Sequence, residues 1–450
     1  VNIRETVCEL RACPSARRRV AARIALMTLF VATIPLGSAQ ADPYDDFAAF
    51  ADTAFVTSAD PLILERFGST LEVPSDWWEY VSETSVAVGF TTNLPAFSYL
   101  EYGTSESYGS STAPSDRRYS QHLHHLTGLT PGVTYQYRAV LEDENGNVVR
   151  GSNRTVTPDV IVDAIRIPDD MSGPPYLLDT PNAHYLVTSD LVAPWRAFEV
   201  TADSIVLDLG GHTVTYNPDF LIIEPMDWWS YVQAAGFGLR SMKNDAIEIY
   251  NGTVVQGPGQ NGAHPDASAG FNPIFLREGA DHEVAGVVFD YGGSQMCGLY
   301  LSFPGSGPVA HHNVFLDRGI EVPNRHGLGS MSVAVVGVVG NVEVYKNLIK
   351  RTRQNALDGA VIRDNEIYVD SYATNSSAII GLSDDRQGFG NRIFGTGYHV
   401  YGIGWGRNNW WHDNFVHLVG QGPDFRYDEY GNQESLNGIR LTQYGGSAYD

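Results

Sequence analysis

The chain has 450 residues, of which 46 are glycine, 24 are tyrosine and 8 are tryptophan. It is long enough for two or three domains, and its glycine content argues against a helical bundle and for a β protein rich in turns. The formal net charge of −23 argues against nucleic acids and anionic membrane surfaces as partners, because the field of such a protein repels them.

The first 41 residues have the pattern of a secretory signal peptide. The arginines at 17–19 precede an apolar run at 24–37, which is shorter than the roughly 20 residues that a membrane span needs, and residues 39–41 form a small-x-small cleavage triplet. We therefore expect a secreted bacterial protein, extracellular or at the cell surface, with no membrane insertion after signal removal. Losing this segment removes more basic than acidic residues and makes the chain still more acidic.

Residues 61–158 have the pattern of a β-sandwich, after a leader or linker at 42–60. Short alternating segments, such as 85–92 and 97–103, are separated by turn residues. In the phrase LTGLTPGVTYQYRA the Pro-Gly pair turns the chain. We expect the hydroxyl of Tyr135 to bond back to the backbone there, as at a corner of a β-sandwich.

This segment resembles a fibronectin type III domain, in the variant found at the front of purple acid phosphatases, on the phrases EYG and LTPGVTYQYR. The resemblance implies a spacer or a module that contacts carbohydrate or protein. Nearby His122, His124 and His125 could suggest a metal cluster. We expect exposed strand histidines instead, with His124 on the face opposite to the other two.

A second pattern begins at about residue 176, after a connector at 159–175. Aliphatic segments alternate with an Asn that follows a polar residue, as in VYKNLI around Asn347 and IRDNEI around Asn365. Spacings between 18 and 40 residues suit β coils with loops inserted between strands. Related units recur at Gly211, Asn251, Gly286, Asn313, Asn391 and Asn414.

The repeated Asn predicts a ladder of side-chain amides. In a parallel β solenoid, equivalent residues of successive coils stack at one strand spacing, and each amide can donate to one neighbour and accept from the other. Asn also tolerates the left-handed backbone needed where one strand bends into the next. We expect the aliphatic residues beside each Asn to fill the interior, as Val342, Val344, Leu348 and Ile349 would in one coil.

Residues 176–450 resemble a right-handed parallel β-helix of the pectate-lyase-like type, and IVLDLGGHTV resembles the first coil of that family. The predicted fold is therefore all-β, with an N-terminal fibronectin type III-like β-sandwich followed by a right-handed parallel β-helix. The resemblance implies a lyase, hydrolase or epimerase of acidic polysaccharides, or a surface protein without chemistry. Because a solenoid needs polar caps and none is evident before Asp450, we expect the C-terminal end to be missing.

Aromatic residues cluster in the segment GYHVYGIGWGRNNWWHDN. A sheet face flanked by inserted loops forms a groove that suits a chain-like ligand, and exposed rings there would stack on sugar faces. We expect substrate binding by residues of the set Tyr401, Trp405, Trp410 and Trp411. Trp410 and Trp411 cannot both face the groove if they share a strand.

Three polar segments could carry chemistry. Arg325 and His326 could supply the positive partner and the base for elimination from a uronate. Lys350 and Arg353 belong to the compact basic run LIKRTRQN, and basic groups are the usual base of β-helix lyases. Solvated loops or bonds to backbone carbonyls are the structural alternatives for both segments.

Asp384, Asp385 and Arg386 form the third polar segment. On a loop, the two carboxylates could serve a hydrolase as acid and base, or hold Ca²⁺ through oxygen ligands as a metal site. A solvated acidic turn is the structural alternative.

We therefore predict a polysaccharide partner, with lyase action on a uronate-containing glycan as the leading enzymatic hypothesis. The acidic field repels a polyuronate unless a bound divalent cation or a local basic patch intervenes. No full match to the catalytic motifs of pectate lyases or polygalacturonases is present. The alternative is a non-catalytic surface or adhesion protein whose β-helix is a rigid stalk, and the oligomeric state stays open.

Overall fold

The computed structural model describes residues 43–217, 237–257, 272–291, 297–302, 307–318, 333–337, 342–352, 356–371, 376–380, 386–397, 400–404, 410–419 and 447–448. All of them belong to one compact unit that begins at Pro43. Within these ranges, no helix has the length and apolar character that crossing a membrane requires.

The described chain begins with helical turns at 43–67, where the sequence predicts a leader or linker up to residue 60 and a β-sandwich from residue 61. These are α2 (Pro43–Ala51), the π-helix η2 (Asp52–Thr57) and α3 (Ser58–Phe67). Tyr44, Phe47 and Ala51 are buried at spacings of three and four, which places them on one helix face. The helices form because this face has an apolar surface to pack against.

An antiparallel sheet follows, and the long strand β2 is at its centre. The first half of β2 pairs with β1 and β4, and its second half pairs with β5 and β3, with a register shift between Thr91 and Ala96. Strands β6 and β7 pair with β5. The strands are β1 (Trp77–Val81), β2 (Ser85–Gly103), β3 (Ser110–Ser111), β4 (Tyr119–Thr127), β5 (Tyr135–Glu142), β6 (Val148–Arg150) and β7 (Arg154–Val156).

The corner before β5 has the hydrogen bond that the sequence predicts. The backbone N–H of Thr130 donates to the hydroxyl oxygen of Tyr135 at 3.0 Å. The fibronectin type III assignment of residues 61–158 itself stays a prediction.

The expectation for the histidines of β4 is wrong. His122 and His124 are two residues apart, so they share a face, and both are buried. The hydroxyl of Ser98 lies 2.7 Å from Nδ1 of His122 and 2.8 Å from Nε2 of His124. Burial lowers the pKa of both rings, so they are neutral members of a core hydrogen-bond network.

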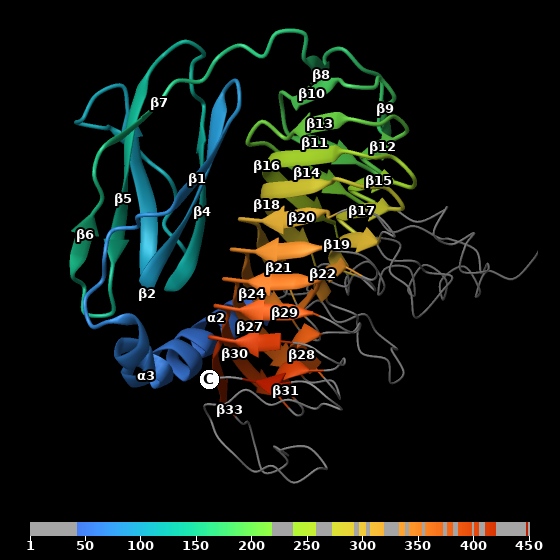
Figure 1. The fold of residues 1–450 in the computed structure, drawn as a ribbon. Helices are drawn as coiled ribbons and strands as arrows, with labels where there is room; N and C mark the ends of the chain where they lie inside the picture. Colours follow the sequence, from blue (N-terminus) through green and yellow to red (C-terminus); the bar gives the residue numbers. More distant parts are fainter. Residues whose placement is uncertain are drawn as a thin grey trace, which may run out of the picture. The chain divides into compact units, whose positions relative to one another are not determined.

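The remaining strands form three parallel sheets that stack coil upon coil, which is the architecture of a parallel β-helix (Figure 1). Strands β16 and β18 bend and run through both of the first two sheets. Sheet 1 contains β8 (Ile165–Ile167), β10 (His184–Val187), β13 (Ile205–Asp208), β16 (Ile247–Gln256), β18 (Glu283–Tyr291), β20 (Val309–His311), β23 (Glu343–Tyr345), β26 (Val361–Arg363), β29 (Gln387–Phe389), β32 (Trp410–His412) and β34 (Ser447–Ala448).

Sheet 2 contains the strands that follow the bend of each coil, and sheet 3 completes the coil. Sheet 2 consists of β11 (Leu191–Ala193), β14 (Thr213–Tyr216), β21 (Val314–Asp317), β24 (Leu348–Thr352), β27 (Glu366–Ser371), β30 (Arg392–Gly397), β33 (Phe415–Val419) and the second halves of β16 and β18. Sheet 3 consists of β9 (Tyr176–Leu178), β12 (Phe198–Val200), β15 (Leu239–Ser241), β17 (Ile274–Arg277), β19 (Cys297–Ser302), β22 (Val333–Gly337), β25 (Leu357–Asp358), β28 (Ser376–Ile380) and β31 (Val400–Gly404).

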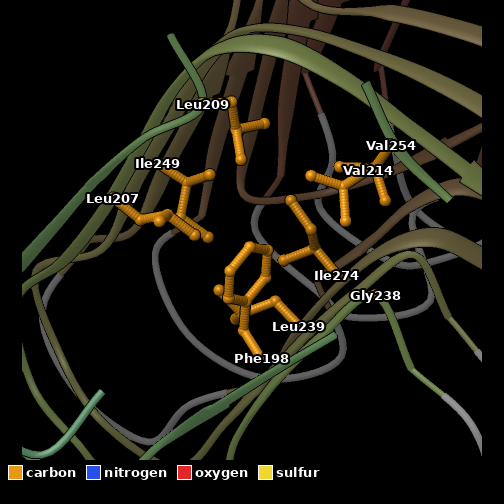
Figure 2. A pocket seen from close by; sticks show the side chains of 9 residues that line it. All are labelled: Phe198, Leu207, Leu209, Val214, Gly238, Leu239, Ile249, Val254 and Ile274. Carbon is orange, nitrogen blue, oxygen red and sulfur yellow. The ribbon is translucent and has the colours of Figure 1, made fainter. Parts of the chain in front are cut away.

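The interior of the β-helix is a continuous apolar core. Val342, Val344 and Ile349 belong to it, as the sequence predicts. Figure 2 shows the lining of a void between the first coils, where all nine residues, from Phe198 to Ile274, are apolar or glycine. Its volume of about 10 Å³ leaves no room for a sugar.

The predicted amide ladder is present from Asn313 to Asn414. The side-chain Nδ2 of each Asn donates to Oδ1 of the next at 2.8 to 3.1 Å. Each Oδ1 also accepts the backbone N–H of the preceding Asn in the ladder. The ladder members are Asn313, Asn347, Asn365, Asn391 and Asn414.

The left-handed residue of each bend is not the ladder Asn, which corrects the expectation. It is the residue immediately before it, as in Lys346 (φ 52°) and Asp364 (φ 56°). Asn251 (φ 62°) belongs to this left-handed column, because Tyr250 is in register with Ala285, whose neighbour is Gly286 (φ 65°). Its amide instead donates to Ser85 and Asp208.

The helices at 43–67 and the antiparallel sheet of β1 to β7 together form what we call the N-terminal unit. It packs on the outer face of sheet 2. Leu348, predicted to be interior, points outward and joins Tyr368, Phe394 and Phe415 in an apolar cluster with residues of β2, β4 and β5. At the centre of this contact, Oε2 of the buried Glu366 accepts the backbone N–H groups of Ser120 and Gln121 at 2.7 Å each. The sheet face is therefore a second core, shared with the N-terminal unit.

A buried carboxyl makes stability depend on pH. Burial raises the pKa of Asp208 from its usual 3.8 to about 6, although hydrogen bonds from donors such as the backbone N–H of Gly210 oppose this rise. The folded state therefore binds this proton more readily than the unfolded state, and stability falls as pH rises from about 4 to about 6, by up to about 1.4 kcal/mol per pH unit. We expect Asp208→Asn to melt above the wild-type protein at pH 7 and to lose that advantage at pH 4. Melting temperatures from pH 4 to 8 test this, and a constant difference between the two proteins would contradict it.

Candidate functional site

The outward side chains of sheet 1 form two adjacent columns along the β-helix axis. In one column Glu343, Val361, Gln387 and Trp410 are in register, and in the other Tyr345, Arg363, Phe389 and His412 are in register. The residues between the columns, such as Val344 and Ile362, belong to the interior core. Because side chains alternate along a strand, the two columns share the outer face of the sheet. We call the set Glu343, Tyr345, Arg363, Gln387, Phe389, Trp410 and His412 the outer stripe.

Rings and one guanidinium of the outer stripe contact neighbours in the adjacent coil or on the same strand. The guanidinium carbon of Arg363 lies 4.0 Å from the ring centroid of Tyr345. The rings of Phe389 and His412 are parallel within 8° with centroids 5.0 Å apart, and Trp410 lies 4.2 Å from His412. Trp410 is 45% exposed, so it offers a large ring to solvent while its neighbours limit its motion.

The polar groups of the outer stripe pair with one another or with the residue that follows them in the chain. Nε and Nη2 of Arg363 each lie 2.7 Å from Oε1 of Glu343, and Nη1 lies 3.2 Å from Asp364. Burial alone would lower the pKa of the Arg363 guanidinium, but the carboxylates of Glu343 and Asp364 outweigh burial and raise that pKa. Nδ1 of His412 lies 2.7 Å from Oδ2 of Asp413.

Beyond Tyr345, the column continues beneath the N-terminal unit. His311 stacks on Tyr345 with centroids 4.7 Å apart, its Nε2 lies 3.0 Å from Glu283, and its Nδ1 lies 2.7 Å from Nδ1 of His312. Trp78 of β1 covers this pair and stacks on His312 at 5.1 Å. Burial, with further contributions from neighbouring cations, lowers the pKa of His312 to about 2, so its ring is neutral.

Two glycines, Gly89 and Gly286, allow β1 and β2 to lie very close to this end of the column. A Cβ at Gly89 would lie 2.6 Å from Cδ2 of His312, and one at Gly286 would lie 2.7 Å from the ring of Trp78. Tyr80 stacks on Tyr250 at 4.3 Å in the same way. The accessible part of the column therefore begins at Tyr345.

The predicted aromatic residues have different places. Trp410 lies in the outer stripe, as one exposed ring of the predicted set. Trp411 follows it in β32, in register with Gly388, and Tyr401 lies in β31 of sheet 3. The side chains of Trp411 and Tyr401, and the whole of Trp405, lie outside the described residues.

Two of the predicted catalytic residues lie in the described part of the chain. The ammonium of Lys350 is 2.7 Å from Oδ1 of Asp116 and 5.2 Å from the ring centroid of Tyr119, so it contributes to the contact with the N-terminal unit. Arg386 is buried next to β29. Lys350 lies on sheet 2 and Arg386 is buried, so neither side chain belongs to the outer stripe. The other predicted residues, Arg325, His326, Arg353, Asp384 and Asp385, lie outside the described residues.

No cluster of three or more His, Cys, Asp or Glu side chains is arranged to hold a metal ion in the part of the chain that the structure describes. The predicted metal ligands Asp384 and Asp385 fall outside that part.

Sequence reasoning missed Tyr345, Arg363, Phe389 and His412 as site residues. Each lies two positions before a ladder Asn, in the phrases EVYKN, VIRDN, QGFGN and WWHDN. The repeat that identified the ladder therefore also carried the stripe, since a fixed distance from the bend fixes the direction of a side chain.

Comparisons with known proteins yield structural likeness alone. No family model matches the chain, and no curated protein matches it. Among solved structures, a family 28 exopolygalacturonase of Yersinia enterocolitica is 10% identical, with 78% of this chain and 92% of that chain covered and a TM-score of 0.34. A pectate lyase of Pectobacterium carotovorum is 9% identical, with 83% and 99% covered and a TM-score of 0.25.

A pectate lyase of Erwinia chrysanthemi, in complex with tetragalacturonic acid, is 10% identical, with 85% of this chain and 100% of that chain covered and a TM-score of 0.22. TM-scores this low carry no argument about activity. The parallel β-helix rests on the strand register of this chain itself.

Proposed function

We propose that the protein binds a polysaccharide chain along the outer stripe. The observation that carries the proposal is the half-exposed ring of Trp410, held against His412 of the same strand, whose ring stacks in turn on Phe389 of the preceding coil. Sugar rings present flat C–H faces that suit such rings, and the polar edges beside them supply hydrogen-bond partners. The row repeats at the strand spacing of about 4.8 Å, which suits a chain-like ligand.

The predicted signal peptide at residues 1–41 would export the protein, which would bring the outer stripe into contact with extracellular polymers. Together these features favour a secreted glycan-binding protein. The rival role, a rigid stalk without a ligand, would need no exposed tryptophan beside stacked rings.

The enzymatic form of the proposal is cleavage of a uronate-containing glycan by elimination. A base removes the proton on C5, the electron pair forms the C4–C5 double bond, the C4–oxygen bond breaks, and the leaving oxygen takes up a proton. Arg325 and His326 are the proposed positive partner and base, with Arg353 as a further basic group, whereas Lys350 is paired with Asp116 at the contact with the N-terminal unit. Asp384, Asp385 and Arg386 are the corresponding proposal for a hydrolase, or for a Ca²⁺ site in the case of the two carboxylates.

An activity assay separates these roles. The purified protein is incubated with pectate, alginate, hyaluronan and neutral glycans, with Ca²⁺ or chelator, while double-bond absorbance and reducing ends are followed together. Both signals rising indicates a lyase, reducing ends alone indicate a hydrolase, and neither signal from a folded protein contradicts the enzymatic form.

Replacing Trp410 tests the binding proposal. We expect Trp410→Ala to weaken binding of an accepted oligosaccharide at least tenfold, or about 1.4 kcal/mol, because the stacked surface is lost. Trp195→Ala is the matched control, since Trp195 is 38% exposed but lies outside the stripe. Calorimetric titration measures both. Equal affinities for the two variants would contradict the assignment of the site.

A further inference from the structure

We propose that the sugar units lying on the outer stripe carry no carboxylate, so that the accepted glycan is neutral, amino-bearing or mixed, and is not a polyuronate. The inference rests on the proposed function, because it concerns the ligand of the same stripe. It is argued from the charges that surround the stacking rings.

In the part of the chain that the structure describes, the two cations that flank Tyr345, Arg363 and Lys346, are paired with protein carboxylates. Arg363 is held by Glu343 on one side and by Asp364 on the other. Lys346, the left-handed residue next to Tyr345, pairs with Asp76 of the N-terminal unit. A uronate arriving at the stripe would have to displace one of these carboxylates before it could use either cation.

Carboxylates outnumber cations along the stripe. Asp413 next to His412 and Asp76 next to Lys346 have side chains 69% and 63% exposed. With Glu343 and Asp364, four carboxylates face the two paired cations Arg363 and Lys346 among the described residues.

Because carboxylates outnumber cations along the described stripe, they repel a ligand that carries a row of carboxylates. A sugar unit stacked on Phe389 or Trp410 would lie about one coil or less, roughly 5 Å along the axis, from Asp364 or Asp413. This is within the Debye length of about 8 Å at physiological salt, so screening of these two carboxylates is incomplete. Arg363 and Lys346, which are paired already, do not compensate this repulsion, whereas an ammonium or hydroxyl group would meet carboxylate acceptors. The formal net charge of −23 acts in the same direction on approach.

The inference restricts the proposed enzymatic chemistry. A uronate that reacts must sit at a unit away from the stripe, while its neighbours on Trp410 and Phe389 are uncharged or cationic. A mixed glycan meets both conditions and a homopolymer of uronates does not.

Three tetrasaccharides of equal length test the inference: xylose, glucosamine and galacturonate tetramers, titrated into the purified protein with chelator present at low and at physiological salt. We expect the galacturonate tetramer to bind at least tenfold more weakly than the better of the other two, and the difference to shrink as salt rises. Galacturonate binding as tightly as the others would overturn the inference while leaving the glycan site in place. Binding of none of the three would overturn both.

Glu343→Gln tests the charge argument within the stripe. Freeing Arg363 from a carboxylate should tighten galacturonate binding about fivefold and leave the xylose tetramer within about twofold. Glu106→Gln, at an exposed carboxylate outside the stripe, is the matched control for net charge. Thermal unfolding confirms that each variant is folded. Equal tightening by the two variants would assign the effect to net charge and contradict the local argument.

Discussion

Asn365→Ala should lower the free energy of unfolding by about 3 to 5 kcal/mol. Oδ1 of Asn365 accepts the backbone N–H and the side-chain Nδ2 of Asn347, both at 3.0 Å, and its own Nδ2 donates to Asn391 and to the carbonyl of Val344. The substitution leaves several of these buried groups without partners, at about 1 to 3 kcal/mol each. Denaturant unfolding followed by circular dichroism measures the loss.

The matched control is Asn145→Ala, at an exposed turn position of the N-terminal unit. We expect it to change stability by less than about 0.5 kcal/mol. If the two variants unfolded alike, the amide ladder would not be an important source of stability.

The second large effect concerns the contact between the N-terminal unit and sheet 2. Glu366→Ala removes the acceptor of two backbone N–H groups, those of Ser120 and Gln121, and the partner of the Tyr368 hydroxyl at 2.7 Å. The nearby buried Arg392 also loses the favourable interaction with this carboxylate. We expect a loss of about 3 to 5 kcal/mol, which is typical of removing one member of a buried polar network.

Glu366→Gln separates charge from hydrogen bonding. Burial raises the pKa of Glu366, because a buried carboxylate loses its hydration. The amide oxygen of Gln carries no charge and can still accept the two N–H groups. We expect the Gln variant to stay within about 1 kcal/mol of the wild type at pH 7. A Gln variant as unstable as the Ala variant would show that the negative charge, and not the acceptor geometry, holds the contact.

The sequence predicted the ladder because its evidence is a repeated residue type. It could not predict which residue bends the chain, because Lys346 has no special preference for the left-handed region, and Asp364 tolerates it no better than the Asn beside it. Both adopt it because the bonds of the following Asn fix the bend. The helices at 43–67 were missed for a related reason, because their apolar face is specified by a tertiary partner.

The contact on sheet 2 could not be read from the sequence. Strands such as β24 and β30 are buried on both faces, inside by the coil and outside by the N-terminal unit, and such strands show continuous apolar runs in which outward Leu348 and inward Ile349 look alike. The resemblance suggested a spacer, whereas the N-terminal unit shares an apolar core with the β-helix. This contact also decides where the outer stripe ends, because β1 covers the column beyond Tyr345.

The candidate site was predicted only at Trp410. Composition drew attention to a cluster of aromatic residues close in sequence, but the stripe joins residues up to 69 positions apart, from Glu343 to His412, through strand register. Such a site becomes visible once the coils are aligned on the ladder, since Tyr345, Arg363, Phe389 and His412 then occupy equivalent positions.

A crystal structure of the protein with a bound neutral tetrasaccharide would test the central claim most directly. The account predicts sugar rings over Trp410 and Phe389, with the chain axis along the coils and one end near Tyr345. Sugar density elsewhere on the molecule, with these rings uncovered, would contradict it.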